Sequence, residues 1–404
     1  MSDIEFIAKA CLTCLNARCH EACPCGNEIP SIIAAVKRGD IASAKETLNL
    51  TNPFPELTSL LCDHERQCRG HCIRGIKGTP VDFPAIERYL ANDRPAAFDE
   101  PHDYCNPKVA IVGAGPAGLS AAYYLRHAGA TIDIFEKREG IGGAIYHGIP
   151  SFRFDKSCLD NIRDRLELGL GMSINRDEID DGMLRRLSRD YDYVLLAVGA
   201  EKSRRLDCPK VPNISDALEL LEDMNLKDDD HGLCDGKNVY VMGGGNVAMD
   251  VSRSLVRRGA KVTLIYRRNE ESMPAQKREI QEAKDDGVIF QTQTNATAFH
   301  LNDDGFLDSM TLVDMGLGEK DESGRPSFFV VEGSERVVAC DAFVMAIGET
   351  SAASELFPSL PELPNVRLVG DCRYGAKNVA SAIKDGREAA LDILRGLMGD
   401  DFGF

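Results

Sequence analysis

The sequence lacks the features that mark membrane proteins, secreted proteins and nucleic-acid-binding proteins. It has no run of about 18 or more apolar residues, and its start, MSDIEFIAKA, has neither the basic nor the apolar stretch of a signal peptide. It also lacks a basic excess, since its formal net charge is −17 at pH 7. Because so acidic a chain repels polyanions, we expect no nucleic-acid partner and no association with an anionic membrane surface. From the missing apolar run and signal peptide we expect a cytoplasmic location.

Close pairs of cysteines are absent from the chain beyond residue 100. The cysteines there stand singly, which argues against the redox dithiol of a disulfide reductase; they are Cys105, Cys158, Cys208, Cys234, Cys340 and Cys372. The other eight of the 14 cysteines fall in the first 72 residues. In a reducing compartment such crowding indicates metal ligation before disulfides.

Two glycine-rich segments show one pattern used twice. They are KVAIVGAGPAGLSAAYYLRHAGATIDIFEKR from Lys108 and KNVYVMGGGNVAMDVSRSLVRRGAKVTLIYRR from Lys237. Each is an apolar strand, a tight glycine turn, a helix, a glycine stop and a second strand, which predicts a βαβ unit of about 30 residues. We therefore expect two Rossmann-like dinucleotide-binding domains.

The remaining segments give the domain order in a chain of 404 residues, which is long enough for two or three domains. Residues 1–100 have helical periodicity, with Gly39 and Asp40 separating two short helices, and residues 96–108 are a predicted linker. Alternation over 289–340 predicts antiparallel strands. The predicted fold class is α/β, with an all-α N-terminal domain (1–100), an FAD-binding domain (105–235 and 346–404) and an NAD(P)-binding domain inserted in it (236–345).

The first glycine turn, GAGPAG, fits the pattern G-x-G-x-x-G directly after an apolar strand. Glu136 ends the following strand, where a carboxylate accepts hydrogen bonds from the adenosine ribose. Gly370 and Asp371, ahead of a helix that begins near Asn378, form the arrangement that holds a flavin, so we assign FAD to this site. The predicted FAD-binding residues are Gly113, Gly115, Pro116, Ala117, Gly118, Glu136, Lys137, Gly370, Asp371, Asn378 and Val379.

The second glycine turn, GGGNVA, carries Ala248 at the third glycine position, and its second strand ends in two arginines where the first site has Glu136. A guanidinium there pairs with a 2′-phosphate, which favours NADP(H), although NAD(H) stays possible. The alternative is a solvated basic strand end. The predicted NADP-binding residues are Gly243, Gly244, Gly245, Asn246, Val247, Arg267 and Arg268.

The N-terminal cysteines form two blocks. The first, C-x2-C-x4-C-x3-C-P, uses Cys11, Cys14, Cys19 and Cys23, and the second, C-x5-C-x3-C, uses Cys62, Cys68 and Cys72. Seven thiolates are too many for one tetrahedral centre and nearly enough for two. Structural zinc is the alternative, but a run that ends in Cys-Pro is typical of iron–sulfur proteins. We therefore expect iron–sulfur clusters, with Cys25 as an extra thiol that is either structural or a bystander.

The motifs together resemble those of the small-subunit family of NADPH-dependent glutamate synthase, over essentially the whole chain. This family includes the electron-input half of dihydropyrimidine dehydrogenase and the large subunit of the ferredoxin:NADP transhydrogenase. The motifs that carry the resemblance are CLTCLNARCHEACP, CDHERQCRGHC, GAGPAG, GGAIYHGIPSFRF, GGGNVAMD, YRRNEESMPA and GDCRYGAKNVASAIKDG.

The resemblance implies a ligand set for each of two 4Fe-4S clusters. One cluster takes Cys11, Cys14, Cys19 and Cys72, and the other takes Cys23, Cys62 and Cys68. The family completes the second set with a Gln or Glu from a following helix, and TPVDFPAIERY has Glu87 at that position. The resemblance also implies contacts of Gly142, Gly143 and Arg153 with FAD, and of Ala346, Ile347 and Gly348 with the nicotinamide nucleotide.

The implied activity is electron transfer between NADPH, FAD and the clusters, to or from a partner oxidoreductase subunit that holds the substrate site. No side-chain acid or base is needed, so no catalytic residue is predicted. The layout is closest to the NAD(P)H-oxidising subunit of bacterial dihydropyrimidine dehydrogenases. A subunit of an electron-bifurcating transhydrogenase complex, and a non-catalytic redox-sensing or assembly subunit, are the alternatives.

Overall fold

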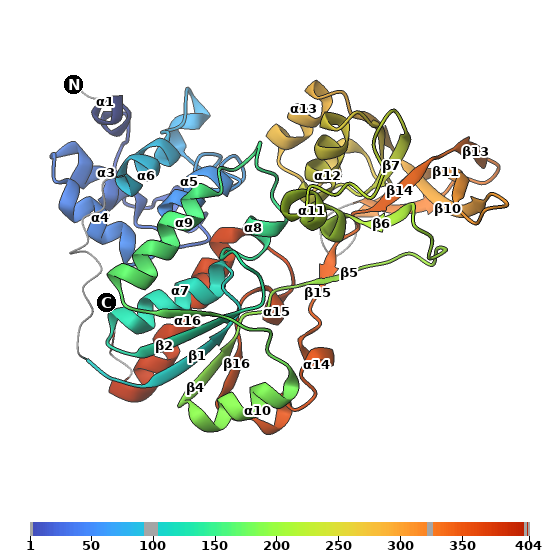
Figure 1. The fold of residues 1–404 in the computed structure, drawn as a ribbon. Coiled ribbons are helices and arrows are strands. Elements are labelled where there is room, and N and C mark those ends of the chain that lie inside the picture. The colour runs from blue at the N-terminus through green and yellow to red at the C-terminus, as the bar shows by residue number, and fades with distance from the viewer. Residues whose placement is uncertain (1–2, 93–103, 321–325, 400–401, 403–404) are drawn as a thin grey trace. The chain divides into compact units, whose positions relative to one another are not determined.

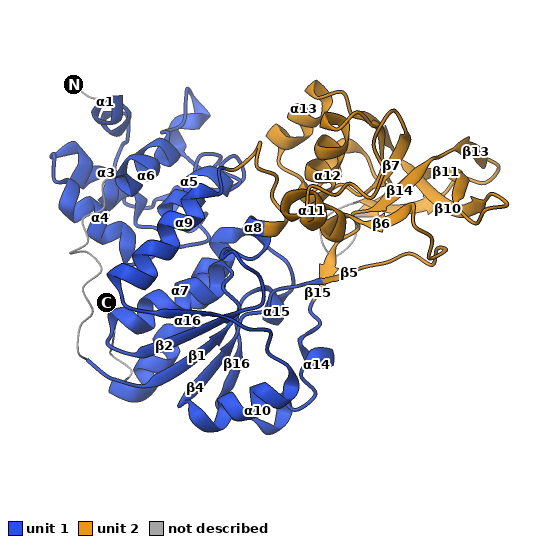
Figure 2. Ribbon diagram, viewed as in Figure 1, with its two compact units in different colours: residues 1–146, 155–201, 351–404 blue, residues 147–154, 202–350 orange. Residues whose placement is uncertain are grey.

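The computed structural model describes residues 3–92, 104–320, 326–399 and 402. The chain forms two compact units (Figure 2): unit 1 comprises residues 1–146, 155–201 and 351–404, and unit 2 comprises residues 147–154 and 202–350. Most of the predicted linker, 96–108, and the end of the predicted helical domain lie outside the described residues. Unit 2 takes up the chain at Lys202, whereas we expected the NAD(P)-binding domain to begin at residue 236.

Short helices form the N-terminal part of unit 1 (Figure 1). The predicted break between two of them is confirmed: Gly39 has φ +75°, and the Asp40 side chain accepts a hydrogen bond from Ser43 N at 3.2 Å, which caps the second helix. Their core includes the buried side chains of Ile32 and Ile86. The helices are α1 (Asp3–Lys9), α2 (Arg18–Glu21), α3 (Ile29–Lys37), α4 (Ile41–Asn49), α5 (Pro55–Leu61) and α6 (Phe83–Ala91), with a 3-10 turn at Ile73–Ile76.

The rest of unit 1 is a parallel five-stranded sheet with the order β16-β4-β1-β2-β3. Its central strand is buried along four of its five residues, as expected for a parallel sheet covered on both faces. The strands are β1 (Lys108–Val112), β2 (Thr131–Glu136), β3 (Ser173–Arg176), β4 (Tyr193–Leu196) and β16 (Val366–Leu368). The helices are α7 (Pro116–His127), α8 (Ala144–His147), α9 (Ser157–Asp164), α10 (Asp181–Asp190), α14 (Ala353–Leu356), α15 (Asp371–Tyr374) and α16 (Val379–Met398).

Unit 2 has its own parallel sheet, with the order β6-β14-β7-β8-β9. The strand β6, which precedes the second glycine turn by more than 20 residues, pairs with β14, so this sheet draws on the chain before residue 236. The strands are β6 (Ile214–Asp216), β7 (Asn238–Met242), β8 (Lys261–Tyr266), β9 (Ile289–Thr292) and β14 (Ala342–Met345). The helices are α11 (Ala217–Leu226), α12 (Asn246–Arg257) and α13 (Lys277–Asp285).

Antiparallel strands follow β9, as the alternation predicted. They are β10 (Thr294–Leu301), β11 (Leu307–Lys320), β12 (Pro326–Val330) and β13 (Arg336–Ala339), and a two-stranded ladder joins β5 (Lys202–Ser203) to β15 (Glu349–Thr350). The prediction was wrong for Ile289–Thr292, because β9 pairs in parallel with β8. Alternation reports that a strand is half buried, and it does not report the direction of its neighbour.

Candidate functional site: two nucleotide turns and two cysteine groups

The first glycine turn joins β1 to α7 in unit 1. Gly113 has φ +105°, and a Cβ built there would lie 2.4 Å from the Ala197 carbonyl oxygen, so only glycine fits. A Cβ on Gly118 would lie 2.1 Å from the Gly113 oxygen. The turn is therefore packed against the end of β4. Helix α7 begins at Pro116, which has no N–H, so the backbone N–H groups that follow it in the first turn are the donors for a pyrophosphate.

The second pair of predicted glycines lies against this turn. The backbone N–H of Gly142 donates to the Ala114 oxygen at 2.7 Å, and a Cβ built on Gly143 would lie 3.0 Å from the Gly115 Cα. Gly143 also has φ +54°. Backbone thus meets backbone here without side chains, which fits a cradle for the diphosphate of FAD.

Glu136, at the end of β2, is 6% exposed and accepts two backbone hydrogen bonds. Its Oε2 accepts from Ala114 N at 2.8 Å and its Oε1 accepts from Arg138 N at 2.9 Å. A carboxylate has about four acceptor positions, so it retains capacity for ribose hydroxyls. The neighbouring Lys137 pairs with Glu201; although burial raises the pKa of Glu201, the hydrogen bond from Lys137 contributes to lowering it overall.

The C-terminal Gly-Asp pair meets the same turn. Gly370 has φ +77°, and a Cβ on it would lie 2.7 Å from the Cβ of Ala117 at the start of α7. Asp371 begins α15, and burial raises its pKa. Asn378 caps α16, its side chain accepting from Ser381 N at 3.0 Å. Among the predicted FAD residues of the C-terminal segment, Gly370 thus lies directly against the first site, and Val379 begins the helix that Asn378 caps.

Helices α7 and α16 lie side by side (Figure 1), and small residues permit their close approach. A Cβ on Gly386 would lie 2.1 Å from the Ala117 oxygen, and Ser120 Oγ donates to the Ile383 oxygen at 2.7 Å. This contact fixes the first half of α16 against the first turns of α7. Sequence reasoning missed Gly386, although a glycine within a 20-residue helix is itself a signal of close packing.

Arg153, which we predicted to contact FAD, lies in unit 2 among buried acidic groups. Its guanidinium pairs with Asp250 at 2.5 Å and with Glu279 at 3.0 Å, and all three side chains are at most 7% exposed. Burial lowers the pKa of Arg153, but the charges of Asp250 and Glu279 raise it above its usual value. Sequence reasoning missed these partners, because no local pattern relates position 153 to positions 250 and 279.

The second glycine turn joins β7 to α12 in unit 2. Gly243 has φ +153°, and a Cβ there would lie 2.1 Å from the Ala346 oxygen, so the turn packs directly on the end of β14. The predicted residues Ala346, Ile347 and Gly348 follow that strand, and Gly348 has φ +102°. Asn246, the first residue of α12 and followed by Val247, accepts a hydrogen bond on its side chain from Gln276 N at 3.0 Å. The structure therefore brings the two predicted halves of this site together.

The predicted phosphate-binding arginines follow β8 and differ in exposure. Arg267 is exposed, whereas Arg268 is 5% exposed and its Nε donates to the Pro326 oxygen at 2.6 Å. Just before them, the ring of Tyr266 covers Gly244, where a Cβ would lie 2.6 Å from it. Sequence reasoning predicted antiparallel strands here but missed the contact between β12 and Arg268.

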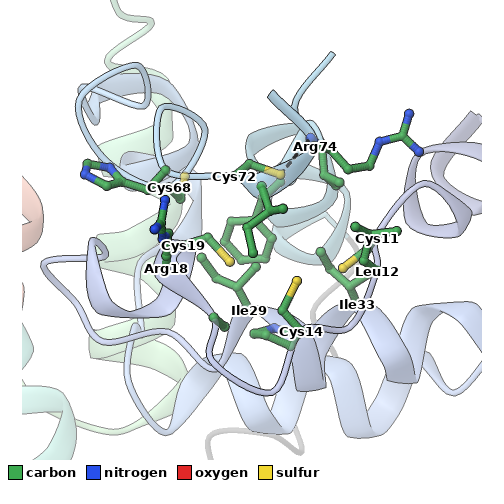
Figure 3. A pocket seen from close by; sticks show the side chains of 16 residues that line it. Cys11, Leu12, Cys14, Arg18, Cys19, Ile29, Ile33, Cys68, Cys72 and Arg74 are labelled. Atoms are coloured by element: carbon green, nitrogen blue, oxygen red, sulfur yellow. Dashed lines mark hydrogen bonds between the residues drawn. The ribbon is translucent and has the colours of Figure 1, made fainter. Parts of the chain in front are cut away.

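A pocket in the N-terminal helices of unit 1 gathers the first cysteine group. Cys11, Cys14, Cys19 and Cys72 line it, and Figure 3 shows them around a shared space with Cys68 to one side. Burial raises the pKa of Cys19 to about 11, and Cys72 and Cys11 add to the rise. The four thiols that the family resemblance assigns to one cluster thus surround one cavity, which fits a 4Fe-4S centre.

A second group lies around Glu87, which is 3% exposed. Burial raises the pKa of Cys23, Cys62 and Cys68, and the charge of Glu87 contributes to each rise. These four residues are the second predicted ligand set. Within the described residues, no three His, Cys, Asp or Glu side chains are grouped as they would be around a single metal ion. A 4Fe-4S cluster holds each ligand on a different iron atom, so its ligands enclose a larger space.

Three donors fix the carboxylate of Glu87 through a single oxygen. Oε1 accepts from Thr58 Oγ1 at 2.7 Å, from Asn52 Nδ2 at 2.9 Å and from Asn27 Nδ2 at 3.4 Å. Burial raises the pKa of Glu87 to about 7, and the three hydrogen bonds lower it in part. Sequence reasoning missed these donors, although Asn27 follows the Cys-Pro motif closely.

Cys25 connects the cysteine-bearing helices to α16. It is 1% exposed, and its thiol lies 3.5 Å from the Ala380 oxygen, which accepts its hydrogen bond. Arg387 Nη1 donates to the Cys25 oxygen at 2.8 Å and to the Thr51 oxygen at 2.6 Å.

The part of the chain that the structure describes contains no helix long and apolar enough to cross a membrane.

Comparisons with known proteins agree with this arrangement. A family model described as pyridine nucleotide-disulphide oxidoreductase matches residues 107–386, and one described as dihydropyrimidine dehydrogenase domain II, 4Fe-4S cluster, matches residues 2–97. The glutamate synthase [NADPH] small chain of Escherichia coli is 33% identical, over 96% of this chain and 90% of its own length. The NADP(+)-dependent formate dehydrogenase subunit beta of Moorella thermoacetica is 33% identical, over 94% of this chain and 60% of its own length.

Among solved structures, FprA of Mycobacterium tuberculosis in complex with NADPH matches with a TM-score of 0.63 and 18% identity, over 72% of this chain and 85% of FprA. The fold class is thereby confirmed. The family models make the chain a flavin-dependent oxidoreductase whose cofactors are FAD, a pyridine nucleotide and 4Fe-4S clusters. The chain belongs to the glutamate synthase small-chain family within the pyridine nucleotide-disulphide oxidoreductases.

Proposed function

We propose that this chain is an electron-transfer subunit that passes electrons between NADPH, FAD and two 4Fe-4S clusters, to or from a partner subunit that holds the substrate site. The observation that carries the proposal is the position of the two cysteine groups in unit 1. The second group, which contains Cys23, lies next to α16 at the predicted flavin site, and the first group lies beside exposed apolar side chains.

Cys25 marks the flavin side of this arrangement. It stands two residues after Cys23, and its thiol donates to the Ala380 oxygen in the first turn of α16. The chemistry that bound FAD would supply is the conversion of a two-electron hydride transfer from the nicotinamide into single-electron transfers to iron–sulfur centres. The residues of this chain position the cofactors: Arg387 holds the Cys25 loop, and the glycine turns hold the nucleotides.

Apolar side chains mark the surface side. Leu12 and Ile73 line the pocket of the first cysteine group and are 59% and 38% exposed, and Leu15, next to Cys14 in the chain, is 102% exposed. Clustered exposed apolar residues are typical of interaction sites. We infer that the partner docks here, next to Cys11 and Cys14. The relatives support a multi-subunit role, since their names include a small chain and a subunit beta.

The pyridine nucleotide is NADP(H) in this proposal. Arg267 and Arg268 follow β8 at the position where a carboxylate would bind the 2′-hydroxyl of NAD(H). The names of the two relatives given above also specify NADPH or NADP(+).

Metal analysis combined with an anaerobic titration tests the proposal. We expect about eight iron atoms and about eight acid-labile sulfides per chain. NADPH should bleach the flavin faster than NADH, and cluster signals should then appear in the electron paramagnetic resonance (EPR) spectrum. Zinc in place of iron would contradict the cluster proposal, and faster bleaching by NADH would contradict the assignment of NADP(H).

A matched pair of leucine variants tests the docking surface. Leu15→Asp places a charge beside the first cysteine group. The control, Leu168→Asp, places the same charge at another exposed leucine of unit 1, which is 83% exposed. Only Leu15→Asp should weaken association with the subunit that co-purifies with this chain, and neither should change flavin bleaching by NADPH. If both variants associate with that subunit to the same extent, whether weakened or unchanged, the contact lies elsewhere.

A further inference from the structure

An aromatic ring on β12 lies against both of the predicted phosphate-binding arginines. The guanidinium carbon of Arg267 is 4.4 Å from the centre of the Phe328 ring, and that of Arg268 is 5.0 Å from it. Both distances lie within the range of a cation–π interaction. All three residues belong to unit 2, and Phe328 comes from a strand about 60 residues beyond the arginines.

The two arginines make different contacts with β12. Arg268 is 5% exposed and donates from Nε to the Pro326 oxygen at 2.6 Å, so it fastens the start of the strand. Its own backbone oxygen accepts from Gln293 N at 2.9 Å. Arg267 is exposed. The buried arginine thus holds the strand that presents Phe328 to the exposed one.

Tyr266, the residue before Arg267, shows where the stack of Phe328 on the two arginines lies relative to the glycine turn. Tyr266 ends β8, its ring covers Gly244 of the glycine turn, and its hydroxyl donates to the Ser272 oxygen at 3.0 Å. The end of the second strand of a βαβ unit is where the adenosine ribose is recognised. Arg267 therefore leaves the sheet at the position of the 2′ substituent.

We propose that Phe328 is a positioning residue for the 2′-phosphate: its ring holds the guanidinium of Arg267 in place for the phosphate, while Arg268 fixes the ring. This inference rests on the proposed use of NADP(H). The physical reason is that an arginine side chain has many rotamers, and a stack on a ring reduces the number it loses on binding. A hydrophobic strand end is thereby turned into a determinant of nucleotide specificity.

Binding of two nucleotide fragments to the full-length, flavin-loaded protein tests the proposal without catalysis. We would measure the dissociation constants of 2′,5′-ADP and 5′-AMP by calorimetry. Phe328→Ala should weaken the binding of 2′,5′-ADP about two- to fivefold, which corresponds to about 0.4–1 kcal/mol, and should leave the affinity for 5′-AMP unchanged. Phe328→Tyr should bind 2′,5′-ADP as tightly as the unchanged protein does, since it retains the aromatic ring.

Phe329→Ala is the matched control. Phe329 is the next residue of β12 and points to the opposite face, where its ring covers Gly316 of β11. This variant should bind both fragments as the unchanged protein does. If Phe328→Ala and Phe329→Ala weaken 2′,5′-ADP equally, the effect comes from loosening β12, and the proposal fails.

The outcomes separate this inference from the proposed function. If the unchanged protein binds 5′-AMP as tightly as 2′,5′-ADP, the assignment of NADP(H) is wrong. If it prefers 2′,5′-ADP, and Arg267→Gln removes that preference but Phe328→Ala does not, NADP(H) stands and the role of Phe328 is wrong.

Discussion

Replacement of Glu87 gives the sharpest test of the second cysteine group. Its Oε1 accepts from Asn27, Asn52 and Thr58, so a carboxylate can satisfy all three donors with one oxygen and ligate iron with the other. We expect that changes at Glu87 alter the cluster that contains Cys23 and leave the cluster that contains Cys11 intact.

The structure gives the magnitude for Glu87→Ala. Without Glu87, Thr58 Oγ1 can still donate to the Phe54 oxygen at 3.5 Å, and Asn52 Nδ2 can still donate to Thr58 Oγ1 at 2.7 Å. The hydrogen bonds lost without replacement are therefore mainly that of Asn27 and in part those of Asn52. At about 1–3 kcal/mol for each buried donor left unsatisfied, the variant should lose roughly 2–4 kcal/mol of stability.

Glu87→Gln separates the two roles of the side chain. An amide has a single oxygen, which can accept from the three donors or ligate iron. Because turning the amide would cost about the same 2–4 kcal/mol, its oxygen should stay with the donors. The variant should therefore keep its stability and lose iron, from about eight to about seven atoms per chain, as three thiolates retain a 3Fe-4S cluster.

Iron analysis, EPR spectra and thermal unfolding of Glu87→Ala and Glu87→Gln check these expectations. Cys25→Ala is the control, since Cys25 is a buried thiol near the same group that we do not assign as a ligand. Full iron content and an unchanged spectrum in both Glu87 variants would refute the reasoning, and so would a change in both cluster signals.

Two further predictions concern the nucleotide domains. Gly143→Ala should reduce the FAD content of the purified protein, measured from its absorbance, because its Cβ would lie 3.0 Å from the Gly115 Cα. The control is Gly171→Ala, since Gly171 also has a positive φ, +63°, but no atom lies within 4 Å of its Cβ, so this variant should keep its flavin. Equal flavin loss in both variants would show that backbone strain, and not the contact with Gly115, causes the loss. Burial raises the pKa of Asp250 to about 6, against the effect of Arg153. Because the folded state holds this proton more tightly than the unfolded chain, its stabilising effect is complete below about pH 4 and is lost as the pH rises through about 6. Asp250→Asn should therefore gain melting temperature relative to the unchanged protein between about pH 4 and 7, and a falling difference would show that the ion pair with Arg153 dominates.

Much of the nucleotide-binding architecture could be predicted from local patterns. The first glycine of each turn, Gly113 and Gly243, stands where a Cβ would clash with the residue that follows a neighbouring strand, so the glycine pattern in the sequence indicates the backbone geometry. The antiparallel assignment of Ile289–Thr292 was wrong because the pattern of a strand does not specify its neighbour.

The sequence by itself determined the local elements of this protein: two glycine turns, the cysteine spacing and the helix break at Gly39. Each of these can be recognised from residue types within a short stretch, although the neighbours that require Gly113 and Gly243 lie far along the chain. Only the tertiary structure decided which other distant side chains meet, such as Arg153 with Asp250 and Phe328 with Arg267. Such pairs arise when whole helices and strands pack to bury apolar surface, and no short pattern records them.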